Sequence, residues 1–71
     1  MKIITEFICD EVSYRVVTAM VGHRLQASTQ ATVWTTLEDG QLQGLLRKYG
    51  VLVRDAITRI PSKIEVPERG E

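Results

Sequence analysis

The strongest constraint on the fold of this 71-residue chain is a period-two pattern of side chains in residues 24–34. Small or apolar side chains fill one set of alternate positions, and polar side chains with one tryptophan fill the other. The first set is Leu25, Ala27, Thr29, Ala31 and Val33, and the second is Arg24, Gln26, Ser28, Gln30, Thr32 and Trp34. Because successive side chains of a strand point to opposite faces, the pattern predicts a half-buried strand that belongs to a sheet.

The preceding segment, residues 12–21, is predicted to be the neighbouring strand. Its apolar residues fit helical spacing as well as alternation, and its density of valine and threonine favours the strand. Gly22 and His23 lie between the two segments, and glycine at the first central position suits a type II′ hairpin turn. That turn pairs Val21 with Arg24 and brings the apolar sets of both strands to one face.

A helix is predicted to begin at Thr35, because residues 35–38, TTLE, have the form of a capping box. Asp39-Gly40 competes with this interpretation as a hairpin turn. The following residues favour the helix, since apolar side chains recur at i, i+3, i+4 and i+7. They are Leu42, Leu45, Leu46 and Tyr49. Gly50 then fits the left-handed position just after a helix, and the cations of the preceding turn complement the helix dipole.

Residues 51–60, VLVRDAITRI, are predicted to be the next strand, with a possible bulge near Arg54-Asp55. Pro61 ends this run, and Ile64–Val66 is an optional short edge strand. A first strand is predicted in residues 2–9, which are rich in β-branched and aromatic side chains. The order β-β-β-α-β predicts a small α+β fold, a mainly antiparallel sheet with one α-helix packed on one face.

Composition limits the chain to one small domain with a thin core. Hydrophobic residues make up 44% of the chain, but only four residues are aromatic. We expect a compact domain over residues 1–66 and a solvated tail over residues 67–71. The single cysteine, Cys9, excludes an internal disulfide and fits a reducing compartment. No apolar run approaches the roughly 20 residues of a membrane span. A cytoplasmic location is therefore expected.

Charge is unevenly distributed in this formally neutral chain. Residues 42–63 carry five cations against Asp55 alone, whereas residues 1–41 and 64–71 each have a net charge of −2. This basic section is either an ordinary solvated face or a contact surface for an acidic partner. Trp34 falls on the polar side of its strand, where it is either covered by neighbouring structure or exposed as an interface anchor. The candidate partner-binding residues are Arg47, Lys48, Arg54, Arg59 and Trp34.

Catalytic and metal-binding chemistry finds little support in the sequence. Cys9 is interpreted as a small hydrophobic residue of the first strand, and His23 as an exposed turn residue. Structural zinc needs four cysteine or histidine ligands, and the chain has two. The carboxylate pairs Asp10-Glu11 and Glu38-Asp39 are better explained by a turn and a helix N-terminus than by a cation site. We therefore expect no enzyme, no cofactor and no metal.

The predicted function is a small protein-binding regulator or inhibitor that docks on a larger cellular machine, such as a polymerase or nuclease. Its contact surface would be the basic section and the sheet. Inhibitors of this size are often encoded by phages and plasmids. One alternative is direct nucleic-acid binding, although acids flank the basic section and Tyr49 is the one aromatic residue nearby. The other alternative is a homo-oligomeric assembly subunit paired through a strand edge. A membrane partner is not expected.

Overall fold

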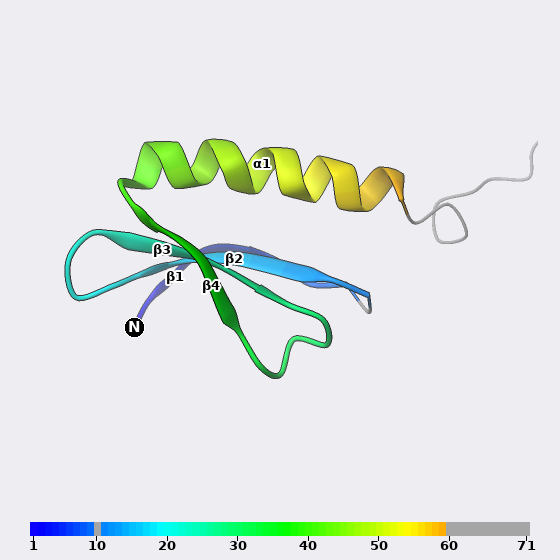
Figure 1. The fold of residues 1–71 in the computed structure, drawn as a ribbon, viewed down its shortest axis with the longest axis horizontal. Coiled ribbons are helices and arrows are strands. Elements are labelled where there is room, and N and C mark those ends of the chain that lie inside the picture. The colour runs from blue at the N-terminus through cyan, green and yellow to red at the C-terminus, as the bar shows by residue number, and fades with distance from the viewer. Residues whose placement is uncertain (10, 60–71) are drawn as a thin grey trace, which may run out of the picture.

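The computed structural model describes residues 1–9 and 11–59. Its elements are β1 (Ile3–Phe7), β2 (Ser13–Thr18), β3 (His23–Ser28), β4 (Thr35–Gly40) and α1 (Leu42–Thr58). The four strands form one antiparallel sheet in the order β1-β2-β3-β4, and α1 lies along one face of it (Figure 1). The predicted fold class, a small antiparallel sheet covered by one helix, is confirmed. The predicted element order differs, because the fourth strand precedes the helix.

Strands β2 and β3 pair with the predicted faces but in a shifted register. Val16 lies opposite Leu25, whereas the predicted hairpin placed Val16 opposite Thr29. A shift of four residues is even, so every side chain keeps its face of the sheet. The apolar side chains therefore meet on one face as expected.

The shift in register comes from a longer loop between β2 and β3. His23 is not a turn residue, as predicted, but the first residue of β3, where it pairs with Thr18. Residues 19–22 make the connection instead. Gly22 has the left-handed φ of 77°, and a Cβ added there would lie 2.9 Å from the carbonyl oxygen of Gly40. Only glycine fits this position without strain, so Gly22 ends the loop rather than beginning a two-residue turn.

The alternation that predicted a strand over residues 24–34 produces a strand only as far as Ser28, and residues 29–34 form a loop. β3 ends at Ser28, and the chain reverses through a loop in which Ala31 has a φ of 62°. Thr35, the predicted helix cap, instead begins β4 and pairs with Ala27. A helix cap contributes about 1 kcal/mol, whereas pairing with β3 satisfies the backbone groups along a whole strand edge. The sheet therefore takes precedence over the local capping signal.

Helix α1 is longer than predicted and begins later. It starts at Leu42 and runs for 17 residues, through Gly50, to Thr58. The predicted end of the helix at Gly50 is therefore wrong, and so is the predicted strand over residues 51–60, with its bulge. The apolar spacing continues through Leu52 and Ala56, which turns the same face to the sheet. A glycine inside a helix costs about 1 kcal/mol relative to alanine, which is less than the gain from burying two more apolar side chains.

The core lies between α1 and the middle strands. Val16, Leu25 and Leu45 are each at most 1% exposed, and they form its centre. Four partly buried side chains of α1 pack around this centre: three belong to the predicted helical stripe, and Leu52 is the fourth. These residues are Leu42, Leu46, Tyr49 and Leu52. The Thr5 hydroxyl donates a hydrogen bond to the Tyr49 hydroxyl at 3.2 Å, which joins edge strand β1 to the helix.

Two predictions lie outside the described residues. They are the optional edge strand Ile64–Val66 and the tail over residues 67–71. Among residues 1–9 and 11–59, no helix combines the length and the apolar character that crossing a membrane requires.

Candidate functional site

The predicted basic residues lie on α1 and at its end. Arg47, Lys48 and Arg54 belong to the helix, Arg59 follows its last residue, and all four are exposed. Because the segment is one helix, Arg47 and Arg54 are about two turns and 10 Å apart on the same face. Val51 lies between them and is 50% exposed. This face points away from the core, since the buried stripe lies on the other side of the helix.

A shallow hollow of about 340 Å³ lies on this part of α1. It is lined by Arg47, Lys48, Val51 and Leu52. Positions 47 and 51 form one i, i+4 pair and positions 48 and 52 form the adjacent pair, so the hollow lies between two ridges of the helix. Aliphatic carbons supply its surface, while the charged ends of the arginine and lysine reach solvent from the rim. An apolar floor with a cationic rim is the result.

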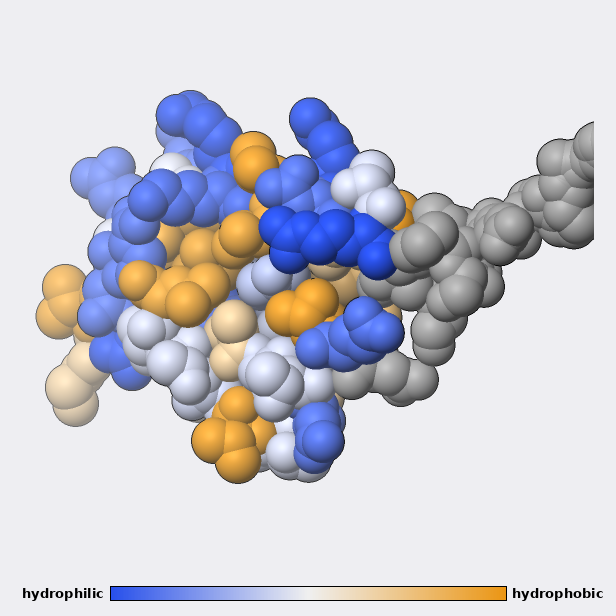
Figure 2. Space-filling model, turned by 45° about the vertical axis from the view of Figure 1, so that its right-hand side comes forward, coloured by the Kyte–Doolittle hydropathy of each residue, from blue (hydrophilic) through white to orange (hydrophobic). Residues whose placement is uncertain are grey.

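The cations of α1 differ in what they contact. Lys48 forms an ion pair with Glu38 of β4, which joins the helix to an edge of the sheet. No ion pair of Arg47 or Arg54 is present among residues 1–9 and 11–59. With Asp55 as its one acid, α1 has an excess of positive charge on its exposed surface. Figure 2 shows hydrophilic side chains projecting from this side of the molecule, with hydrophobic surface visible between them.

Trp34, the fifth predicted site residue, lies apart from the basic residues. It is half-buried just before β4, and the Arg15 guanidinium stacks over its ring at 4.1 Å from the centroid. Arg15 also donates a hydrogen bond from Nε to Oε1 of Gln26 at 2.8 Å. Arg15 alternates with Val16, whose side chain faces α1, so this cluster lies on the opposite face of the sheet. The structure therefore divides the five predicted residues between two surfaces.

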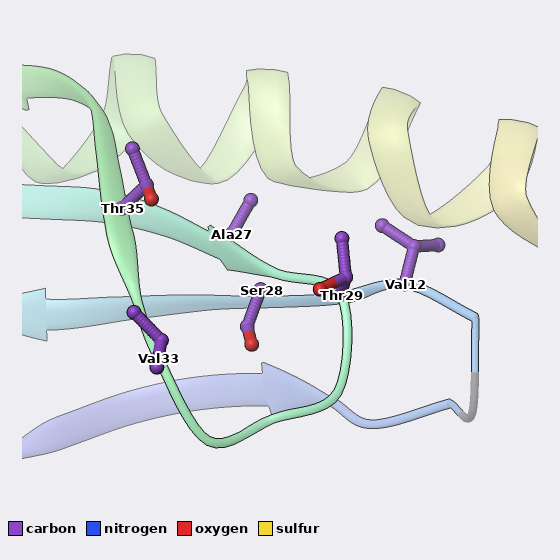
Figure 3. Close-up of a pocket in the computed structure, with 6 residues that line it drawn as sticks. All are labelled: Val12, Ala27, Ser28, Thr29, Val33 and Thr35. Atoms are coloured by element: carbon purple, nitrogen blue, oxygen red, sulfur yellow. The ribbon is translucent and has the colours of Figure 1, made fainter.

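A second hollow lies beside the loop that joins β3 to β4, and no sequence pattern indicated it. It has a volume of about 300 Å³, and its lining residues are Val12, Ala27, Ser28, Thr29, Val33 and Thr35. Figure 3 shows Val12 and Ala27 directed toward the helix. None of the lining side chains is charged or titratable at neutral pH, so this hollow provides surface for apolar contact and no acid–base group.

Cys9 and His23, the one cysteine and one histidine of the chain, are far apart. Cys9 lies two residues beyond the end of β1, not within that strand as predicted, and Ser13 Oγ bonds to its backbone N–H at 3.0 Å and to its carbonyl at 3.1 Å. His23 pairs with Thr18, at the other end of β2. The five-residue separation of Ser13 and Thr18 along the strand corresponds to about 17 Å. Within the described part of the chain, these two groups cannot act on one substrate atom.

No protein-family model, curated protein or solved structure matches this chain. Its class is therefore defined by the fold itself, a four-stranded antiparallel meander covered on one face by a C-terminal helix of the described region.

Proposed function

We propose that this protein is a small protein-binding regulator or inhibitor, and that it docks on a larger protein through the exposed face of α1. The hollow lined by Arg47, Lys48, Val51 and Leu52 carries the proposal. Its apolar floor accepts an apolar side chain, and its cationic rim attracts carboxylates. Arginine is enriched at protein interfaces, and the buried centre of an interface is more apolar than its rim.

The placement of the aromatic residues supports a protein partner over a nucleic acid. Proteins that hold single strands place aromatic rings among their cations, so that bases can stack on them. Tyr49 packs against the core and bonds to Thr5, and Trp34 lies across the sheet under Arg15. The basic face of α1 therefore carries aliphatic side chains where a nucleic-acid site would need aromatic rings for base stacking.

The strand edges support a different partner over a second copy paired edge to edge. β1 and β4 are the edge strands, and each pairs irregularly with its neighbour. The register shifts between Ile3 and Thr5 on β1, and between Leu25 and Gln26 where β3 meets β4. Such bulges twist an edge strand and oppose its continuation into another sheet.

The partner class follows from charge. A surface that complements this face carries carboxylates around an apolar side chain. Polymerases and nucleases present acidic clusters at their two-metal sites, so they are the class of partner with which testing begins. A regulator that covered such a cluster would act by occlusion and would need no catalytic group of its own.

Affinity capture with matched charge reversals tests the proposal. Wild-type protein, Arg47→Glu, Arg54→Glu and Lys2→Glu are each used to capture partners from a cell lysate. Lys2 is exposed and lies outside α1, and its reversal changes the net charge by the same amount. We expect one stoichiometric partner with wild type and Lys2→Glu, and its loss with either arginine variant, while circular dichroism remains unchanged.

Two results would count against this function. The first is equal recovery of the partner by all four proteins, which would place the contact elsewhere. The second is no partner together with binding of DNA or RNA in a gel shift that weakens steeply with salt, as counterion release requires.

A further inference from the structure

We infer that the partner element that seats on α1 is an acidic amphipathic helix, lying in the groove between two ridges of α1. This inference rests on the proposed function and names the kind of structure that the site recognises. It follows from the shape of the helix surface, from one glycine and from the spacing of the cations.

The groove is defined by two neighbouring i, i+4 rows of α1. The first row is Gln43, Arg47, Val51 and Asp55, and the second is Gly44, Lys48, Leu52 and Ala56. The hollow is lined by two residues of each row, so it is a widened part of the groove that separates them. A groove of this direction is what receives the matching ridge of a second helix in the commonest class of helix packing. A ridge of a partner helix therefore fits it lengthwise.

Gly44 opens the groove one turn before the hollow. It is exposed, and a Cβ built there meets no atom within 4 Å. The core gains nothing from this glycine, although a glycine inside a helix costs about 1 kcal/mol relative to alanine. Glycine does allow another backbone to come close. At this position it removes the side chain that would stand before Lys48 in the second row, and so leaves room for the partner.

The cations specify the partner's charge pattern. An apolar side chain in the hollow contacts Val51 and Leu52, and carboxylates beside it reach Arg47 in the first row and Arg54 in the row next to it. These arginines are seven residues apart, or about 10 Å along the axis. A matching helix therefore carries acidic side chains on both sides of the apolar residue that enters the hollow. Asp55 lies beyond the hollow in the first row, where it repels an acid and so favours one register.

A defined peptide pair tests the inference with the full-length chain. The probe is a synthetic helical peptide of about five turns, with leucines on one face, flanking glutamates and alanine elsewhere. Its control is a scrambled isomer of the same composition and charge that has no apolar face. Binding is measured by fluorescence anisotropy. We expect the amphipathic peptide to bind at least about tenfold more tightly than its isomer, a difference of about 1.4 kcal/mol.

Two matched variants of the protein locate the binding surface. Gly44→Leu fills the groove, whereas Gly50→Leu adds the same side chain about 240° further around the helix. Both positions are exposed with open space above them, and leucine raises helix propensity at both, so both variants keep the fold. We expect Gly44→Leu to weaken peptide binding about tenfold. Gly50 lies outside both rows of the groove, so Gly50→Leu should weaken binding much less.

The outcomes separate this inference from the proposed function. Equal affinity for the two isomeric peptides, or no binding of either, overturns the helical partner even if Arg54→Glu abolishes capture from a lysate. Equal weakening by both leucine variants overturns the groove. Loss of capture with Gly44→Leu but not with Gly50→Leu supports the inference with the cellular partner itself.

Discussion

Replacing Gly50 with alanine should stabilise the protein. The sign of the change in stability shows whether α1 continues through Gly50 or ends there. Gly50 lies inside the helix and is exposed, and a methyl group added to it would meet no atom within 4 Å. Alanine therefore changes helix propensity and adds no clash. The expected gain in the free energy of unfolding is about 0.8–1.0 kcal/mol. For a domain of this size the melting temperature should rise by roughly 3–8 °C.

Urea unfolding provides the measurement, with far-UV circular dichroism and Trp34 fluorescence as two probes of one transition. The midpoint should rise while the slope with denaturant stays constant, because the surface exposed on unfolding does not change. Gly44→Ala should raise the midpoint by less than Gly50→Ala, because Gly44 is the third residue of α1 and lies in its first turn. Gly22→Ala is the opposing control and should destabilise, since its φ is 77° and the new Cβ would lie 2.9 Å from a backbone oxygen.

The result that would refute this reasoning is a loss of stability in Gly50→Ala. If the helix ended at Gly50 in a left-handed conformation, as the sequence pattern suggested, alanine would cost about 1 kcal/mol. The two structures therefore predict changes of opposite sign at one residue. A fall of this size would mean that the helix ends at Gly50, and Arg47 and Arg54 would then not lie on one helix face.

Three further experiments test other contacts. Leu45→Ala should lower the free energy of unfolding by about 2–5 kcal/mol, because Leu45 is 1% exposed at the centre of the core; a loss below about 1 kcal/mol in urea unfolding would mean that α1 is not seated there. Tyr49→Phe should cost about 0.5–1.5 kcal/mol in thermal unfolding by removing the hydrogen bond to β1, and no change would show that this bond is absent in solution. A double-mutant cycle of Arg15→Ala and Trp34→Ala should give a coupling of about 0.5–1 kcal/mol, and strictly additive effects would contradict the stacking.

The sequence predicted those features that depend on local periodicity. Alternation predicted that the segments before and after the β2–β3 loop pair as strands. The register differs from the predicted one by an even number of residues, so each side chain stays on its predicted face of the sheet. The i, i+3, i+4, i+7 spacing identified the half of α1 that carries Leu45 and Tyr49. Each pattern marks the side of a strand or helix that carries apolar residues. That side is buried in the folded protein, so the pattern predicts it correctly even when the bounds or register of the element differ.

The errors arose where two weak local signals opposed a long-range contact. Thr35 and Glu38 have the spacing of a capping box, yet they pair with β3, and only the free edge of β3 decides between the two. Gly50 resembles a helix end, yet the stripe continues to Ala56 over a sheet that extends beneath it. Each local signal is worth about 1 kcal/mol. The pairing and burial that override such signals depend on residues elsewhere in the chain.

Counting charges by segment predicted the residues of the basic face but not its shape. Arg47 and Arg54 were assigned to opposite sides of a helix–strand junction, and one continuous helix places them on one face. Trp34 was grouped with them, although it lies on the far side of the sheet, where Arg15 stacks over its ring. The hollow depends on two adjacent helical rows, so it becomes visible only when the helix is known to continue past Gly50.

The two exposed glycines of α1 allow stability to be separated from recognition. Each costs about 1 kcal/mol relative to alanine, a large share for a small domain whose total stability is typically about 5–15 kcal/mol. Gly44 lies in the groove, whereas Gly50 lies outside it. Enlarging either side chain should raise stability, but enlargement at Gly44 should weaken binding of the acidic helix much more than enlargement at Gly50. A binding loss in a protein that has become more stable cannot come from unfolding, and must come from the groove.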